Sequence, residues 1–189
     1  YRRAPLALPS RLYGAALAVF VLCVVQIALG GWGSTSYAVL ACTDFPTCHG
    51  AWWPAMDFEH GFTIWRELGV GKDGEWLSFD ALTAIHYVHR LAAYVVLAAL
   101  AGLAIALWRA GAGQPSLRNW AAAIGGAAAW QLASGLSNVV LGWPLLAAVA
   151  HTGGAAMIVV LLTMLLARAY QARAGVPAID AARLRVAAP

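Results

Sequence analysis

Four long apolar runs constrain this chain most strongly, at about residues 12–32, 82–108, 117–141 and 145–167. Each run has the roughly 20 residues that an α-helix needs to cross the hydrocarbon core of a bilayer. The composition agrees, because 62% of the residues are hydrophobic and only 11% are charged, whereas a soluble domain carries about 25% charged residues. We therefore predict an all-α integral membrane protein in which residues 1–189 form one domain, a bundle of four transmembrane helices.

The distribution of charge predicts the orientation of the helices. Acidic residues concentrate in the long connection 33–81, at Asp44, Asp57, Glu59, Glu67, Asp73, Glu75 and Asp80. Most arginines flank the other ends of the runs, at Arg2, Arg3, Arg11, Arg109, Arg118, Arg168, Arg173, Arg183 and Arg185. The positive-inside rule then places both termini in the cytoplasm and the loop 33–81 in the periplasm of a bacterial inner membrane. The net charge of +4 follows this topology, and no nucleic-acid signature is visible.

Two cysteines lie six residues apart in the long loop, in the segment CTDFPTCHG. The segment ends like the covalent heme motif C-x-x-C-H, but the position of that motif's first cysteine is Phe45. An oxidising periplasm favours a disulfide between Cys42 and Cys48. A metal site that adds His49 and His60 is the alternative, although the cysteine spacing is unusual for zinc. Covalent heme attachment is the least favoured interpretation.

Histidines inside the apolar runs are the strongest candidates for function, because ionisable residues are costly in a membrane. His89 lies seven residues beyond Leu82, and His151 lies six beyond Leu145. Both would therefore lie roughly 10 Å below the outer ends of their helices. Two histidines at matched depth on separate helices can ligate one heme iron from opposite faces, as in a b-type site. Packing, a proton relay or another metal are the alternatives.

Two neighbours of His89 are further candidates for the pocket. His86 lies one helical turn closer to the surface and near the same face. It could be a ligand instead, but its depth matches that of His151 less well, so we favour a pocket role, with a place at the membrane interface as the alternative. Arg90 suits a heme propionate, because a guanidinium matches a carboxylate, or it snorkels to the lipid headgroups. The roles of His49 and His60 stay open.

A weak internal repeat relates the two halves of the chain. Gln26-x3-Gly30 in the first run matches Gln131-x3-Gly135 in the third, and each of these runs precedes one that holds a candidate ligand. This pattern suggests two helix pairs related by a pseudo-two-fold axis along the membrane normal, although both glutamines could simply form hydrogen bonds between helices. Tryptophans gather near the outer ends of the runs and predict an interfacial belt, at Trp32, Trp52, Trp53, Trp65, Trp76 and Trp143.

Three segments carry a resemblance to a known family: QIALGGWGSTSYAVLACTDFPTCHGAWWPAMDF, ALTAIHYVHRLAA and SNVVLGWPLLAAVAHTGGA. They resemble the C-terminal half of heme A synthases, which have two similar four-helix halves. The resemblance implies that His89 and His151 are the axial ligands of heme b and that Cys42 and Cys48 form a disulfide. It also implies an activity, the oxidation of the C8 methyl of heme O to the formyl of heme A.

One departure from the family bears on which half this is. The substrate half of the family has a glutamate three residues before the histidine of the His-Arg pair, and this chain has His86 there. We therefore expect the non-catalytic heme b half. Since the chain begins at Tyr1, we also expect a fragment or processed product, whose partner is an N-terminal half or another copy of the family.

The expected role of this half is electron transfer or structural support, because a bis-histidine iron has no open position for oxygen. Heme O is the expected substrate of the whole enzyme, and a quinone is one candidate electron partner. The alternative is a b-type cytochrome subunit that carries electrons between quinone and a partner. A heme-free transport or assembly protein is a further alternative, which predicts a colourless protein.

Overall fold

The computed structural model describes residues 5–67, 69–71 and 74–175. It contains four long helices, α1 (Ser10–Thr35), α3 (Phe79–Ala110), α4 (Pro115–Val140) and α5 (Leu145–Arg173), and a short helix α2 (Phe58–Gly61). Extended pairing within these residues is limited to two isolated bridges in the loop. The all-α class is therefore confirmed.

Each predicted apolar run coincides with one long helix, and the helices extend beyond the runs at most ends. Within the described residues, α1, α3 and α5 are long and apolar enough to cross a membrane. Helix α4 has 26 residues, which is sufficient length, but alanine, glycine and serine replace the larger aliphatic residues and lower its mean hydropathy. Three candidate spans are thus supported, and a fourth remains a prediction.

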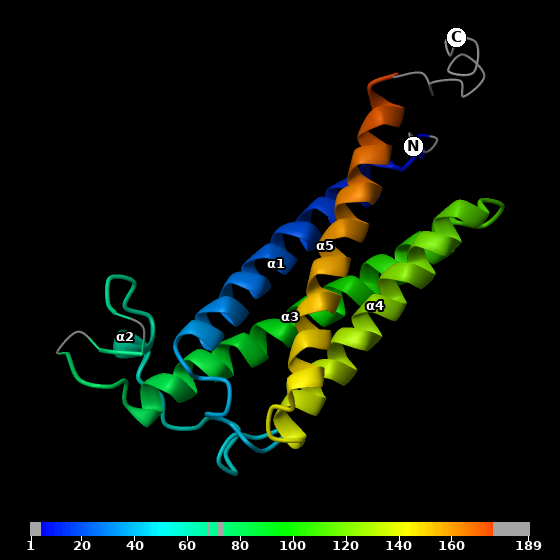
Figure 1. The fold of residues 1–189 in the computed structure, drawn as a ribbon. Coiled ribbons are helices and arrows are strands. Elements are labelled where there is room, and N and C mark those ends of the chain that lie inside the picture. The colour runs from blue at the N-terminus through cyan, green and yellow to red at the C-terminus, as the bar shows by residue number, and fades with distance from the viewer. Residues whose placement is uncertain (1–4, 68, 72–73, 176–189) are drawn as a thin grey trace, which may run out of the picture.

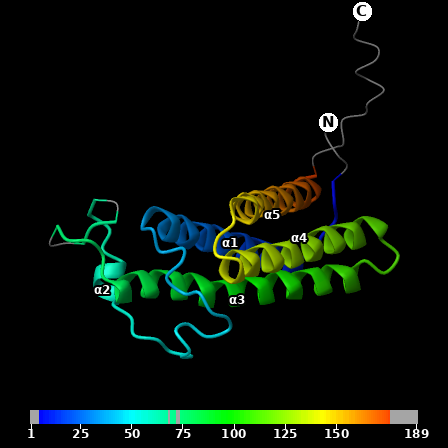
Figure 2. The ribbon, with the colours of Figure 1, turned by 60° about the horizontal axis from the view of Figure 1, so that its bottom comes forward.

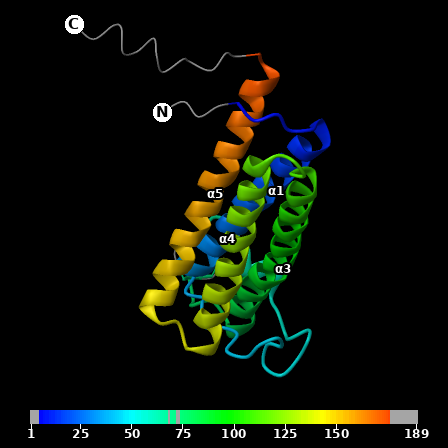
Figure 3. The ribbon, with the colours of Figure 1, turned by 90° about the vertical axis from the view of Figure 1, so that its right-hand side faces the viewer.

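The long helices form a closed ring in which α1 and α4 each contact both α3 and α5. No contact joins α1 to α4 or α3 to α5 within the described residues. The start of α1, the α3–α4 turn and the end of α5 lie at one end of the bundle (Figures 1 and 3). The long loop and the α4–α5 turn lie at the other end, hereafter the loop end. The loop and the helix ends flanked by arginines therefore lie at opposite ends of the bundle, as the charge pattern predicts, whereas the side of the membrane that each end faces stays a prediction. Arg2, Arg3, Asp73, Arg183 and Arg185 lie outside the described residues.

The packed core lies in the part of the bundle remote from the loop end. Its fully buried aliphatic side chains come from α3, α4 and α5 and include Leu100, Leu107, Leu117, Ile124, Leu162 and Leu165. Backbone and ring contacts close the bundle there, since the Leu6 amide donates to the Arg168 carbonyl at 3.2 Å. The Arg173 guanidinium lies 4.3 Å from the centre of the Tyr13 ring. The core therefore leaves the loop end as the place for a cavity.

The loop between α1 and α3 covers the loop end of the bundle. Its second part, with α2, lies beside the first turns of α3 and away from α4 and α5 (Figure 2). The first part contains a disulfide between Cys42 and Cys48, which confirms the predicted pairing. Since both thiols are used in this bond, they are not available to the alternative metal site.

Asp44 organises the turn that the disulfide closes. Its carboxylate accepts hydrogen bonds from the Thr47 hydroxyl at 2.6 Å, the His49 amide at 2.7 Å and the Gly50 amide at 3.0 Å. These donors, the Thr47 hydroxyl foremost, hold the pKa of the Asp44 carboxyl below its usual value. Burial acts in the opposite direction but is outweighed.

Acid should therefore weaken this turn. A carboxyl whose pKa is lower in the folded state stabilises that state above its unfolded pKa of about 3.9 and ceases to do so as the pH falls through the folded pKa. We expect Asp44→Asn to speed reduction of the disulfide by a phosphine a few-fold at pH 7, and the two proteins to converge in strong acid. Equal reduction rates at pH 7 would show that the carboxylate contributes nothing to the turn.

Candidate functional site

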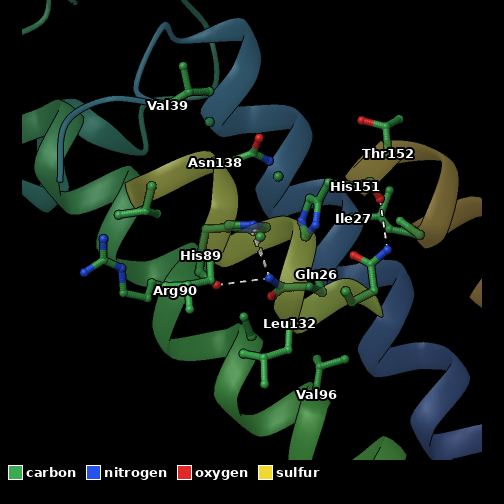
Figure 4. Close-up of a pocket in the computed structure, with 18 of the residues that line it drawn as sticks. Gln26, Ile27, Val39, His89, Arg90, Val96, Leu132, Asn138, His151 and Thr152 are labelled. Carbon is green, nitrogen blue, oxygen red and sulfur yellow. Dashed lines mark hydrogen bonds between the residues drawn. The ribbon is translucent and has the colours of Figure 1, made fainter. Parts of the chain in front are cut away.

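A pocket of about 460 Å³ opens between all four long helices toward the loop end, as Figure 4 shows in part. This volume lies within the range of roughly 300–1,000 Å³ for small-molecule and cofactor sites. The wall remote from the loop is apolar and includes Cys23, Val96, Leu97, Leu100 and Ile158. Polar side chains line the part nearer the loop, namely Ser34, His86, Arg90 and Asn138. The pocket thus suits a largely apolar molecule with one polar edge.

His89 enters the pocket from α3 and packs against α1. A Cβ atom built on Gly30 would lie 3.0 Å from Cε1 of His89, so any larger residue would push the ring. Gln26, one helical turn earlier in α1, donates from Nε2 to the His89 carbonyl at 3.0 Å. The same Nε2 lies 3.1 Å from Nδ1 of the ring.

His151 enters the pocket from α5 in the same way, against α4. A Cβ atom on Gly135 would lie 3.0 Å from Cε1 of His151. Gln131 donates from Nε2 to the His151 carbonyl at 2.9 Å. The Gln-x3-Gly repeat therefore forms the same contact twice, once for each histidine. Both glutamines also form hydrogen bonds between two helices, which is the alternative explanation of the repeat. Figure 4 shows both imidazole rings at the same pocket.

The remaining histidines have partners in the loop. His49 Nε2 lies 2.6 Å from the Ala41 carbonyl oxygen, and its ring stacks on Phe79. His60 Nδ1 lies 2.6 Å from Oδ2 of Asp57. The hydrogen bond from the His60 backbone amide, and after it the contact with the ring, lowers the pKa of the Asp57 carboxyl. No group of three or more histidine, cysteine, aspartate or glutamate residues suited to a metal ion occurs in the described part of the chain.

Arg90 and His86 hold the disulfide loop against α3. Arg90 is buried, and its Nη1 donates to the carbonyl oxygens of Asp44 at 3.0 Å and Thr47 at 2.7 Å. His86 Nδ1 lies 3.1 Å from the Ala38 carbonyl oxygen and 3.3 Å from the Cys42 amide nitrogen. Snorkelling of Arg90 to the headgroups is therefore not what the structure shows. Both side chains also line the pocket, so the predicted pocket roles remain predictions.

Sequence reasoning missed two polar residues of α4. Asn138 lines the pocket with only 3% of its surface exposed, and its Oδ1 has no hydrogen-bond partner. Ser134 Oγ lies 3.0 Å from Nδ1 of His151. Their positions three and seven residues after Gln131 on the helix could have marked them as neighbours on the same face.

The fold and the pocket define a helical membrane-type protein with paired histidines between two similar helix pairs. Residues 2–163 match the COX15-CtaA family model, described as cytochrome oxidase assembly protein. The chain therefore belongs to this heme A synthase family, as its three motif segments predict.

The chain is similar to proteins named heme A synthase. A heme A synthase of Shewanella oneidensis is 35% identical over 159 residues, which cover 84% of this chain and 44% of the relative. A heme A synthase of Methylobacterium nodulans is 36% identical over 144 residues, which cover 76% of this chain and 37% of the relative. The chain thus spans less than half the length of the relatives that it matches. No solved structure matches it.

Proposed function

We propose that this chain is the heme b-binding half of a heme A synthase, with His89 and His151 as the two axial ligands of the iron. The observation that carries the proposal is the repeated contact at the site. Each histidine is backed by a glycine and anchored by a glutamine at the same spacing, on helices that face each other across one pocket. Membership of the heme A synthase family supports it.

The residues present fit a heme. Two imidazoles alone are too few ligands for most metal ions in proteins, which take four or more, whereas a porphyrin already supplies four nitrogens to its iron. Glycine at positions 30 and 135 leaves room for each imidazole ring beside the neighbouring helix. The polar rim, which includes Ser34 and Arg90, suits a molecule that has polar groups at one edge.

The side chains around the histidines would hold and shield the cofactor. When bound, the heme would supply one-electron redox chemistry. Gln26 and Gln131 fix the backbone of the ligand helices, and the apolar wall keeps water from the inner side of the pocket. Arg90 positions the disulfide loop over the pocket, and its guanidinium would suit a propionate at the polar rim.

This half would act together with a second one. Helix α3 has no carboxylate after Asp80, so His86 stands where the family's substrate half has its glutamate. We propose that α4 completes a four-helix membrane domain whose loop is periplasmic, and that an N-terminal half or another copy of the family binds heme O. Oxidation of its C8 methyl would take place there, with this chain as electron carrier or support.

Deletion of the gene for this chain from its host tests the proposal. We expect membranes of the deletion strain to lose heme A and accumulate heme O, measured by mass spectrometry of extracted hemes, and reintroduction of the gene to restore heme A. Unchanged heme A would contradict the proposal. Heme absorption in the purified chain together with unchanged heme A would instead favour the alternative of a b-type cytochrome subunit.

A further inference from the structure

The two histidines differ in what holds their rings, although their backbones are held alike. The matching pentapeptides are QIALG in α1 and QLASG in α4. Their fourth positions are Leu29 and Ser134, so only the second repeat has a hydroxyl there. This is the one chemical difference within the repeat, because the other changed position exchanges isoleucine for leucine.

Ser134 contacts His151 from behind the pocket. Its Oγ lies 3.0 Å from Nδ1 of the imidazole and donates to the Trp130 carbonyl at 2.8 Å. The Trp130 carbonyl is the nearest acceptor for the single hydroxyl proton, nearer than the Gln131 carbonyl at 3.4 Å. A proton directed to this carbonyl leaves the Ser134 oxygen to accept from Nδ1. Ser134 is 7% exposed and does not line the pocket. The contact therefore selects the tautomer of His151 that keeps the Nε2 lone pair free for a metal.

Among the residues that the structure describes, no such acceptor lies at the His89 ring. The Gln26 nitrogen lies 3.1 Å from Nδ1 and 3.4 Å from Nε2 of His89. It therefore contacts the ring without a clear preference for either ring nitrogen. Its bond to the His89 carbonyl identifies this atom as the amide nitrogen, since two carbonyl oxygens do not form a hydrogen bond. An amide nitrogen donates only. The ring of His89 is thus held by packing against Gly30 and by a donor.

We infer that Ser134 is a positioning residue that makes His151 the firmer and more basic of the two axial ligands and leaves His89 the weaker one. The inference rests on the proposed heme site. A hydrogen bond from the outer N–H of a ligating histidine fixes the ring and raises its basicity, and loss of such a partner typically lowers metal affinity by about 10–100-fold. Greater basicity also favours ferric over ferrous iron, so the hydroxyl should lower the reduction potential.

The test compares three variants of the heme-loaded chain in detergent. Ser134→Ala removes the hydroxyl, Ser134→Thr keeps it, and Ser137→Ala removes a hydroxyl that makes the same bond to its own helix, to Ala133 at 2.8 Å. We measure the heme midpoint potential and the rate of heme transfer to excess apomyoglobin. For Ser134→Ala we expect transfer about tenfold faster and a higher potential. A tenfold loss of affinity in the ferric form alone would correspond to about 59 mV for a one-electron couple.

The outcomes separate the inference from the proposed function. The inference is supported if Ser134→Ala changes the midpoint potential and the transfer rate while Ser134→Thr and Ser137→Ala keep the wild-type values. A wild-type potential and transfer rate in Ser134→Ala, or an equal effect of Ser137→Ala, overturns it while the heme site stands. A wild-type chain that binds no heme, or that keeps it after loss of either histidine, overturns both.

Discussion

Replacement of His89 or His151 with alanine is expected to remove heme from the purified chain. In the proposed site each helix pair supplies one ligand, so the loss of either histidine would leave the iron with a single protein ligand. We expect the heme-to-protein ratio, measured by absorption of the pyridine complex, to fall at least about tenfold for either variant. About tenfold is the smallest loss of metal affinity that is typical when a residue supporting a ligand is removed, and here the ligand itself is removed. His151→Ala should have the larger effect, because Ser134 supports His151.

A third histidine provides the matched control. His60 lies in α2, pairs with Asp57 and does not line the pocket. His60→Ala should therefore keep the wild-type ratio. Retention of heme in both membrane-histidine variants, or equal loss in all three, would refute the ligand assignment.

The second large effect is expected at the contact between α4 and α5. A Cβ atom on Gly154 would overlap Nε2 of Gln131 and lie 2.6 Å from Cδ1 of Trp130. Neither side chain is free to move aside, because Gln131 is bonded to the His151 carbonyl and Trp130 Nε1 donates to the Ala150 carbonyl at 3.1 Å. Gly154→Ala would thus force the helices apart beside His151. We expect the free energy of unfolding to fall by about 1–3 kcal/mol, measured by thermal denaturation in detergent, together with loss of heme.

The neighbouring glycine separates packing from helix propensity. A Cβ atom on Gly153 would meet nothing within 4 Å, so Gly153→Ala should be neutral or slightly stabilising, as alanine is favoured over glycine in a helix. Similar melting of both variants and the wild type would show that α4 and α5 do not approach as closely as the structure has them.

The long helices could be predicted from the sequence because the hydrophobicity of a segment depends only on the residues within it. The run at 82–108 lies within Phe79–Ala110, and the Ser78 side chain accepts from the Ala81 amide at the start of that helix. The run at 117–141 has a lower mean hydropathy than the other three runs. Its alanines and glycines permit close helix packing, and they are less apolar than the larger aliphatic residues whose places they take.

The site could be predicted in part. Depth and spacing bring His89 and His151 to one pocket, and the repeat marks Gln26 and Gln131. The bonds of Arg90 could not be predicted, since their acceptors lie 43 and 46 residues away in an irregular loop. Only the folded loop, with its disulfide and the Asp44 turn, brings those carbonyl oxygens to the guanidinium.

Electron paramagnetic resonance of the oxidised, heme-loaded chain tests the central claim most directly. Two imidazole ligands make ferric heme low-spin, so we predict a low-spin signal in the wild type and a high-spin signal for any heme that remains in His89→Ala or His151→Ala. His60→Ala should keep the wild-type spectrum. A high-spin wild type, or a low-spin signal that survives the loss of either histidine, would contradict a heme held between His89 and His151.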